Sequence, residues 1–188
     1  MKVAILGYGK MGQIIEKIAL ERGHNILLKI NLSNIDELNI ENLKKADVVI
    51  DFSTPESAKT NIILSIDANK PIISGTTGWL NDYKEVKDYC IQNNGTFLYA
   101  SNFSLGVNLF FELNKNLAKL MKKHKQYQIN LTEIHHSEKL DAPSGTAISL
   151  AEQIISESDI KNKWTVNPKN SDEELKIDAH REGNIIGT

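Results

Sequence analysis

Near its amino terminus the chain reads Val3-Ala4-Ile5-Leu6-Gly7-Tyr8-Gly9-Lys10-Met11-Gly12, an apolar run followed by glycines in the pattern G-x-G-x-x-G. The apolar run predicts a short buried strand, and residues 11–22 repeat apolar side chains at helical spacing. A second apolar run at 26–30 predicts another strand. A strand, a glycine loop, a helix and a strand in this order indicate a βαβ unit with two parallel strands.

The alternation of apolar runs and helical periods continues through the first half of the chain. Strands are expected at 46–52, 71–74 and 96–100, and helices at 55–68 and 81–92. After Asn102 the rhythm changes, and we expect a long helix at 105–123, a strand at 127–135, a helix at 144–157 and then a polar, weakly patterned stretch to residue 177. The sequence thus predicts an α/β protein with a nucleotide-binding domain over 1–103 and a smaller α+β domain over 104–188.

Each glycine of the first loop has a predicted role. Gly7 makes the tight turn, Gly9 lets the backbone approach a diphosphate, and Gly12 lets the helix pack closely on the strand. The diphosphate then lies at the helix N-terminus, where free N–H groups favour an anion. A glycine-rich turn without a ligand is the alternative, and the strand before and the helix after the loop disfavour it.

The residue that follows the second strand bears on the choice of dinucleotide. Asn31 stands where an acid usually accepts hydrogen bonds from the adenosine ribose and repels a 2′-phosphate. An asparagine can bond the ribose without that repulsion, and Lys29 and Ser33 could assist a phosphate. The sequence therefore leaves both NADH and NADPH open as the cofactor.

Composition excludes several classes of protein. Of the 188 residues 40% are hydrophobic and 24% are charged, the net charge is −2, and no basic block suggests binding to nucleic acid or to a membrane surface. The N-terminal apolar run is too short for a secretory signal, and no segment is long enough to span a bilayer. The single cysteine, Cys90, forms no internal disulfide and is expected as a small buried hydrophobe, which agrees with a reducing cytoplasm.

The most informative stretch for function runs from residue 133 to 147 and reads Glu133-Ile134-His135-His136-Ser137-Glu138-Lys139-Leu140-Asp141-Ala142-Pro143-Ser144-Gly145-Thr146-Ala147. Two histidines and a lysine lie at the end of a predicted strand, before a loop that enters a helix. Ser144 is a natural N-cap, so the amides of Gly145 and Thr146 lie in the first helical turn, available to a carboxylate. Lys139 adds a cation. We therefore expect a proton donor beside a site for a small dicarboxylate substrate.

Each residue of this stretch also has a simpler interpretation. Ser144 can cap a helix without any ligand. Adjacent histidines on a strand point to opposite faces, so one of His135 and His136 can be structural. The two histidines do not match the usual spacing of zinc ligands, so no metal is expected. Their occurrence together with a dinucleotide loop favours the functional interpretation.

These residues resemble a known family, the dihydrodipicolinate reductases. A long and specific motif of that family is very similar to His135-His136-x-x-Lys139-x-Asp141-Ala142-Pro143-Ser144-Gly145-Thr146-Ala147. Four further segments agree with the family in order and spacing: residues 7–12, 47–53, 75–78 and 101–108. The resemblance covers essentially the whole chain.

The resemblance implies an NADH- or NADPH-dependent oxidoreductase that reduces dihydrodipicolinate, or its hydrated precursor, to tetrahydrodipicolinate in cytoplasmic lysine and diaminopimelate biosynthesis. It implies a Rossmann-like first domain, a substrate domain on a mixed sheet, and a homotetramer formed through those sheets. His135 is implied as the catalytic acid/base and Lys139 as a second proton donor. The implied substrate-binding residues are His136, Lys139, Ser144, Gly145 and Thr146. The implied cofactor-binding residues are Gly7, Tyr8, Gly9, Lys10, Met11, Gly12, Asn31, Phe52, Ser53, Gly75, Thr76, Thr77, Ala100, Ser101, Asn102 and Phe103.

In the family, the motif at residues 181–188 continues through a histidine, another strand and a final helix, so the resemblance implies a chain whose substrate domain is truncated. Two other functions stay open. One is another small dehydrogenase acting on an amino acid or its semialdehyde, which the string from His135 to Thr146 disfavours. The other is a catalytically impaired dinucleotide-binding module, which an intact His135 and Lys139 disfavour.

Overall fold

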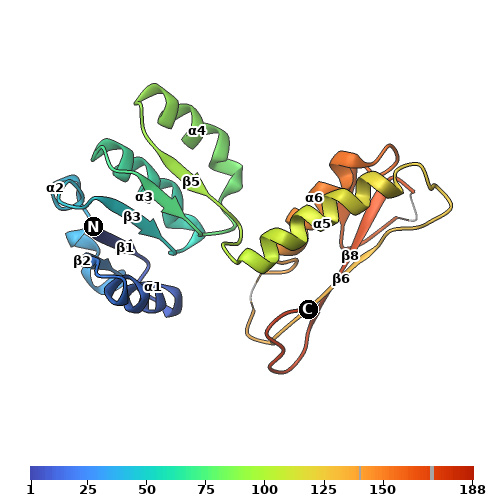
Figure 1. The fold of residues 1–188 in the computed structure, drawn as a ribbon, viewed down its shortest axis with the longest axis horizontal. Helices are drawn as coiled ribbons and strands as arrows, with labels where there is room; N and C mark the ends of the chain where they lie inside the picture. Colours follow the sequence, from blue (N-terminus) through green and yellow to red (C-terminus); the bar gives the residue numbers. More distant parts are fainter. Residues whose placement is uncertain (140, 170–171) are drawn as a thin grey trace. The chain divides into compact units, whose positions relative to one another are not determined.

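The computed structural model describes residues 1–139, 141–169 and 172–188. They form two compact units, Met1–Ser101 and Asn102–Thr188, coloured blue to green and yellow to red in Figure 1. No helix in the described part of the chain combines the length and apolar character needed to cross a membrane.

The first unit is a parallel sheet with helices between its strands. Its strands are β1 (Lys2–Leu6), β2 (Asn25–Ile30), β3 (Val48–Asp51), β4 (Ile72–Ser74) and β5 (Phe97–Tyr99), in the spatial order β2-β1-β3-β4-β5. Its helices are α1 (Lys10–Glu21), α2 (Ile40–Leu43), α3 (Pro55–Asp67) and α4 (Tyr83–Gln92), with the 3₁₀ segments η1 (Leu32–Glu37) and η2 (Leu80–Asp82). All four strand pairs are parallel, so the carboxyl ends of the strands meet at one edge of the sheet.

Burial explains why the apolar runs become central strands. In β1 the residues Val3 to Leu6 are at most 2% exposed, because helices cover both faces of a parallel sheet. Between β3 and β4, α3 begins with Pro55 at its first helical position, where a missing N–H costs nothing. The parallel βαβ arrangement predicted from the sequence is confirmed, as is the Rossmann-like domain that the resemblance implies.

The second unit packs two helices and a small sheet. It contains α5 (Leu105–Met121), β6 (Leu131–His135), α6 (Gly145–Glu157), β7 (Lys163–Thr165) and β8 (Glu174–Arg181), with sheet order β6-β8-β7. α5 and α6 lie side by side in Figure 1, and the Asn114 amide of α5 donates to Leu150 O and Gln153 Oε1 of α6, both at 3.1 Å. The core below α6 includes Leu175 and Ile177 of β8, both fully buried.

The structure differs from the sequence prediction in four places. β6 starts at Leu131 rather than at residue 127. The stretch expected to be weakly patterned contains β7 and the first half of β8, the middle strand of the second sheet. Both pairs among β6, β8 and β7 are parallel, so these described strands do not form a mixed sheet. Residues 32–43, for which no element was predicted, form η1 and α2.

Candidate active site

The glycine loop of the first unit has the geometry of a diphosphate cradle. Gly7 has φ +86°, and a Cβ there would overlap the Phe52 carbonyl. A Cβ at Gly12 would overlap the Gly7 carbonyl, so only glycine lets α1 approach this closely. At Gly9 nothing lies within 4 Å of the Cβ position, which leaves space above the loop. The three positions therefore have the surroundings that the predicted roles require.

The N-terminus of α1 has room for an anion. Gly9 is its N-cap, no side chain caps the helix, and the first turn contains no acidic residue. The first N–H groups of a helix have no acceptor within the helix, so those of Lys10 and Met11 are directed toward the open space at Gly9. These residues fit the diphosphate of a nicotinamide dinucleotide.

The end of β2 is tied to the glycine loop. Gly7 N and Tyr8 N both donate to Ile30 O at 3.0 Å. Tyr8 also donates its hydroxyl to Glu16, and Lys29 Nζ lies 3.1 Å from Glu16 Oε1. The hydrogen bonds from Tyr8 and Lys29 lower the pKa of Glu16. Lys29 is thus held by an anion at the edge where a 2′-phosphate would lie.

The side-chain oxygen of Asn31 already accepts hydrogen bonds from a nearby residue of the chain. Its Oδ1 accepts from Ser33 N at 2.8 Å and from Ser33 Oγ at 2.6 Å, which caps η1. The NH₂ group is the part of the amide that remains for a ligand, and an NH₂ group can only donate. A donor at this position suits a phosphate as well as a ribose oxygen.

A buried carboxylate joins the ends of β3 and β4. Asp51 is 0% exposed. Its Oδ1 accepts from Ser53 Oγ at 2.6 Å and Asn61 Nδ2 at 2.9 Å, and its Oδ2 accepts from Ser74 Oγ and Thr76 Oγ1, both at 2.8 Å. Four donors around one carboxylate offset the cost of burying its charge.

The loops that follow β3 and β4 are locked together beside Asp51. Ser53 N donates to Thr76 Oγ1 at 2.9 Å, and a Cβ at Gly75 would overlap the Phe52 ring. Thr77 follows, half-buried, before the turn at Gly78. The structure thus brings together the predicted cofactor residues Phe52, Ser53, Gly75 and Thr76. Ala100, with its N 3.3 Å from Ser74 O, and Ser101 end this unit.

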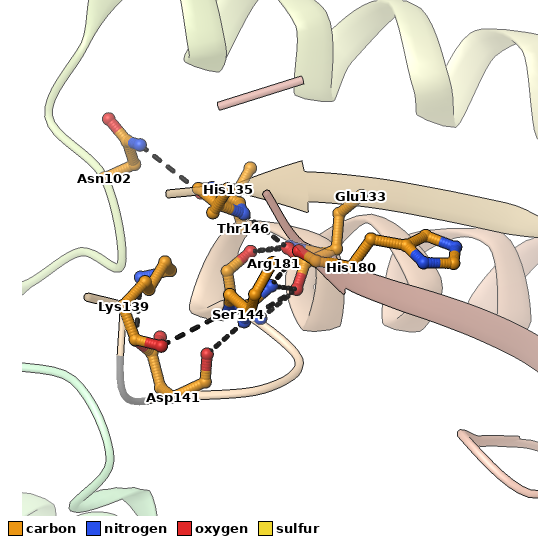
Figure 2. Close-up of polar contacts among 10 residues, drawn as sticks. Asn102, Glu133, His135, Lys139, Asp141, Ser144, Thr146, His180 and Arg181 are labelled. Atoms are coloured by element: carbon orange, nitrogen blue, oxygen red, sulfur yellow. Dashed lines mark hydrogen bonds and ion pairs between the residues drawn. The ribbon is translucent and has the colours of Figure 1, made fainter. Parts of the chain in front are cut away.

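In the second unit, strand register places three polar side chains on one face. Glu133 and His135 are two residues apart on β6 and so point the same way. Arg181 of β8 is the register partner of His135 and shares that face. Figure 2 shows His135, Arg181 and Ser144, the residue before α6, around the carboxylate of Glu133.

Glu133 is the centre of this convergence. The residue is 4% exposed, and its Oε1 accepts from Ser144 N at 2.9 Å while its Oε2 accepts from the Ser144 hydroxyl. Arg181 NH2 lies 3.4 Å from Glu133 Oε1. Arg181 also donates to the carbonyls of Lys139, at 3.3 Å, and Asp141. This pair therefore fastens the loop between β6 and α6 to the sheet.

The N-terminus of α6 keeps two N–H groups for a ligand. Ser144 is the N-cap, as predicted, and its Oγ accepts from Ala147 N at 3.2 Å. Ser144 N already donates to Glu133. The N–H groups of the first turn that have no acceptor in the helix are therefore those of Gly145 and Thr146. Thr146 Oγ1 also lies 3.4 Å from Asn102 Nδ2. This corner of the unit can bind a carboxylate.

His135 lies next to this corner in a partly dry environment. Its side chain is 17% exposed, and its Nδ1 is 3.4 Å from Glu133 Oε2. Burial lowers the pKa of His135, and the positive charges of Lys139 and Arg181 act in the same direction, against the negative charge of Glu133. The imidazole therefore releases a proton more readily than an exposed histidine.

Lys139 and His136 complete the predicted set. Lys139 Nζ forms a 2.7 Å ion pair with Asp141 Oδ1, and Lys139 N donates to His136 O at 3.1 Å. His136 directly follows the last residue of β6. Phe103, predicted for the cofactor, is 44% exposed at the start of this unit.

Asp51, Glu133 and Arg181 hold these clusters together, although none of the three had a predicted role. Asp51 and Glu133 each interrupt an apolar strand with a carboxylate, and a charge on a predicted buried strand was the available signal. Arg181 gave no signal, because its place depends on the pairing of β6 with β8.

The chain matches known proteins along its full length. Residues 1–103 match the family described as dihydrodipicolinate reductase, N-terminus, and residues 106–188 the family described as dihydrodipicolinate reductase, C-terminus. The 4-hydroxy-tetrahydrodipicolinate reductase of Christiangramia forsetii is 45% identical over 188 residues, which are 100% of this chain and 77% of the relative. That of Rickettsia rickettsii is 35% identical over 182 residues, 95% of this chain and 74% of the relative.

A solved structure agrees in fold. The dihydrodipicolinate reductase from Paenisporosarcina sp. TG-14, solved with dipicolinate bound, aligns with a TM-score of 0.71 and 24% identity, over 100% of this chain and 80% of that chain. Two family matches that together cover nearly every residue, and relatives at 45% and 35% identity, establish the assignment. The chain belongs to the dihydrodipicolinate reductase family.

Proposed function

We propose that this chain reduces 4-hydroxy-tetrahydrodipicolinate to tetrahydrodipicolinate with NADH or NADPH, in the biosynthesis of diaminopimelate and lysine, and that His135 supplies the proton. The observation that carries the proposal is the position of His135 beside an α6 N-terminus with two available N–H groups. The relatives at 45% and 35% identity are named for this reductase activity, which supports the same reaction.

The substrate carboxylates would bind in the second unit. The N–H groups of Gly145 and Thr146 and the Thr146 hydroxyl offer donors to one carboxylate, and α6 carries no acidic residue in its first turn to oppose the anion. Lys139 supplies a positive charge for the ring or its second carboxylate, and His136 a further donor. Donors on both carboxylates hold the ring in one register, which is the positioning contribution to the rate.

His135 would act where negative charge develops. When bound, the reduced nicotinamide supplies a hydride, that is, one hydrogen with two electrons. After water has left its 4-hydroxy position, the substrate is a conjugated imine. Addition of the hydride leaves an electron pair on a carbon conjugated with that imine. His135 protonates this carbon, so that one hydride and one proton saturate the bond. Lys139 is the second candidate donor for this proton.

The first unit would hold the dinucleotide through the glycine loop and the two loops fixed by Asp51. The diphosphate would lie at the α1 N-terminus, and the adenosine ribose near Asn31 and Lys29. Residues Phe52, Ser53 and 75–77 would lie near the nicotinamide, together with Ala100, Ser101, Asn102 and Phe103. The geometry of Gly7, Gly9 and Gly12 supports the placement of the diphosphate.

The deciding experiment is a coupled assay. Pyruvate, aspartate semialdehyde and the upstream synthase generate the substrate, and oxidation of NADH or NADPH is followed after this chain is added. We expect turnover with at least one cofactor, and a loss of turnover in His135→Gln. Binding of NADPH without any turnover would instead favour a dinucleotide-binding module.

Two finer expectations from the family resemblance remain proposals. One is a cytoplasmic location, with which the unpaired Cys90 agrees. The other is a homotetramer, and exposed leucines on α5, such as Leu113 at 63%, offer apolar surface for subunit contacts. Light scattering on the purified chain would give the number of subunits.

A further inference from the structure

Glu133 has a more elaborate setting than a structural carboxylate on a small sheet needs. It is 4% exposed and faces Ser144 N, the Ser144 hydroxyl and the Arg181 guanidinium. Neither the binding of the carboxylates nor the proton transfer described above assigns it a role. Its two oxygens nevertheless contact the residue that caps α6 and face the residue that supplies the proton.

One ring nitrogen of His135 lacks, among the described residues, the hydrogen-bond partner that a buried polar atom normally has. Its Nδ1 is buried and forms no hydrogen bond with any residue in the described ranges. A carboxylate oxygen, Glu133 Oε2, lies 3.4 Å from it. Buried polar atoms without a partner are rare in proteins, and a carboxylate oxygen at this distance is a suitable acceptor for an Nδ1–H.

We propose that Glu133 is a positioning residue with two tasks: it fixes the carboxylate-binding N-terminus of α6 through Ser144, and it accepts the Nδ1–H of His135 as the counter-charge of the imidazolium. This proposal rests on the proposed function, because it assumes that His135 acts as an acid. One buried anion would then support both the binding of the substrate carboxylate and the protonated state of His135.

The proton transfer balances without a proton reaching Glu133. His135 carries protons on both nitrogens before the transfer. The Nε2–H bond breaks, its proton goes to the substrate carbon, and its electron pair stays on Nε2. Nδ1 keeps its proton, directed at Glu133 Oε2, so the neutral imidazole that remains is the Nδ1–H tautomer.

Arg181 allows Glu133 to remain ionised in this position. It lies 3.4 Å from Glu133 Oε1, and it also donates to the carbonyls of Lys139, Asp141 and His180. Oε1 thus accepts from Ser144 N and pairs with Arg181, while Oε2 accepts from the Ser144 hydroxyl and faces the imidazole (Figure 2). A buried charge with such donors is tolerable where a lone one is not.

Four charged residues act on His135. Glu133 belongs to its own strand, Arg181 to the neighbouring strand β8, and Lys139 and Asp141 to the loop that leads to α6. The negative charges of Glu133 and Asp141 raise the pKa of His135, while burial and the positive charges of Lys139 and Arg181 lower it. Removing the charge of Glu133 must therefore lower that pKa further.

The first test measures the histidine itself and needs no turnover. The chain has five histidines, and His135→Gln identifies the signal of His135 in an NMR titration. We expect the neutral wild-type ring to carry its proton on Nδ1. In Glu133→Gln we expect a pKa of His135 lower by about one unit, because the amide can donate to or accept from the ring but cannot balance its charge.

The second test separates the two tasks by kinetics and binding. Glu133→Gln should lower kcat about tenfold at pH values above the pKa of His135, where one pKa unit changes the protonated fraction about tenfold, and should move the pH profile to lower pH. Dipicolinate, used as the probe, should still bind within about threefold, because the amide oxygen still accepts from Ser144 N. Glu133→Ala should lose both the binding of dipicolinate and the wild-type pH profile of kcat. Glu133→Asp should restore much of the pH profile.

Glu138→Gln is the matched control, since Glu138 is an exposed carboxylate of the same loop and does not act on His135. An Nδ1 without a proton in neutral wild-type His135, or an unshifted His135 pKa in a folded Glu133→Gln, would overturn the proposal. If Glu133→Gln does not fold, the wild-type tautomer still decides. Absence of turnover in the wild type would refute the proposed function while these NMR results still judge Glu133.

Discussion

The hydroxyl of Thr76 donates to the fully buried carboxylate of Asp51 at 2.8 Å, which binds the loop after β4 to the end of β3. Because Asp51 also accepts from Ser53, the two loops expected to contact the nicotinamide share one anchor. The proposed cofactor site of this unit therefore depends on an anion that does not itself face solvent.

Asp51→Asn should weaken both folding and cofactor binding. An amide replaces one acceptor by donors, so at least one of the hydroxyl or amide donors around residue 51 loses its partner. We expect a loss of about 2 kcal/mol in the free energy of unfolding and about tenfold weaker NADPH binding. Chemical denaturation and fluorescence titration measure the two effects. Asp88→Asn, at an exposed position on α4, should change neither. Unchanged NADPH affinity in Asp51→Asn would mean that the loops do not contact the cofactor.

His135→Gln should remove the acid without disturbing the dinucleotide. We expect kcat to fall by about two to four powers of ten, with little change in NADPH affinity, because His135 and the glycine loop belong to different units. Steady-state kinetics and NADPH titration measure the two quantities. His180→Gln is a suitable control, since His180 is exposed and points away from Glu133 in Figure 2. Near-wild-type turnover in His135→Gln would exclude His135 from the mechanism.

Lys139→Ala should produce two effects with different causes. Loss of a cation at the substrate site should raise KM and lower kcat, each by about tenfold. The positive charge of Lys139 also lowers the pKa of His135, so its removal should raise that pKa. The acid form of His135 is needed, so activity falls as pH rises through this pKa, and the fall should move to higher pH in the variant. A pH profile of kcat measures the shift. A shift to lower pH would contradict the assigned electrostatics.

The two halves of the chain differ in how far their sequence determines what the structure shows. In the first unit the signals are local: glycines beside an apolar run, and strands short enough to be wholly buried. β8 was not predicted although Leu175, Ile177 and Ala179 alternate with charged residues, since the flanking sequence is polar. Its pairing with β6 sets the distance between Glu133 and Arg181, which are 48 positions apart. No local pattern specifies such a register.

The candidate site shows the same division. Ser144, Gly145 and Thr146 could be placed at a helix N-terminus because N-caps are short-range signals. The role of Asn31 as a cap for η1 was not predicted, since it depends on the turn through Ser33 and Asn34. The lack of a hydrogen-bond partner at Nδ1 of His135 among the described residues depends on packing alone, so no sequence pattern predicts it.

Asn31→Asp should move cofactor preference from NADPH toward NADH. An aspartate can still accept from Ser33 N and Ser33 Oγ, so η1 should keep its cap. The new negative charge repels a 2′-phosphate but accepts from ribose hydroxyls. We expect the ratio of kcat/KM for NADPH over NADH to fall about tenfold. Asn39→Asp adds the same charge at another N-cap in this unit and should leave the ratio unchanged. If the ratio is also unchanged in Asn31→Asp, residue 31 is not at the ribose.

Gly187→Ala should slow proton transfer by crowding the imidazole. A Cβ at Gly187 would lie 3.1 Å from Nε2 and 3.2 Å from Cδ2 of His135, closer than ordinary van der Waals contact. Nε2 is the nitrogen that does not face Glu133, so the added methyl group would stand where the substrate must approach. We expect kcat to fall by about tenfold or more while NADPH affinity and thermal stability stay near wild type. Gly106→Ala is the control, because its Cβ would meet only Ser104 Oγ at 3.8 Å. Equal kcat in both variants would mean that the proton leaves His135 by another path, with Nδ1 the remaining candidate.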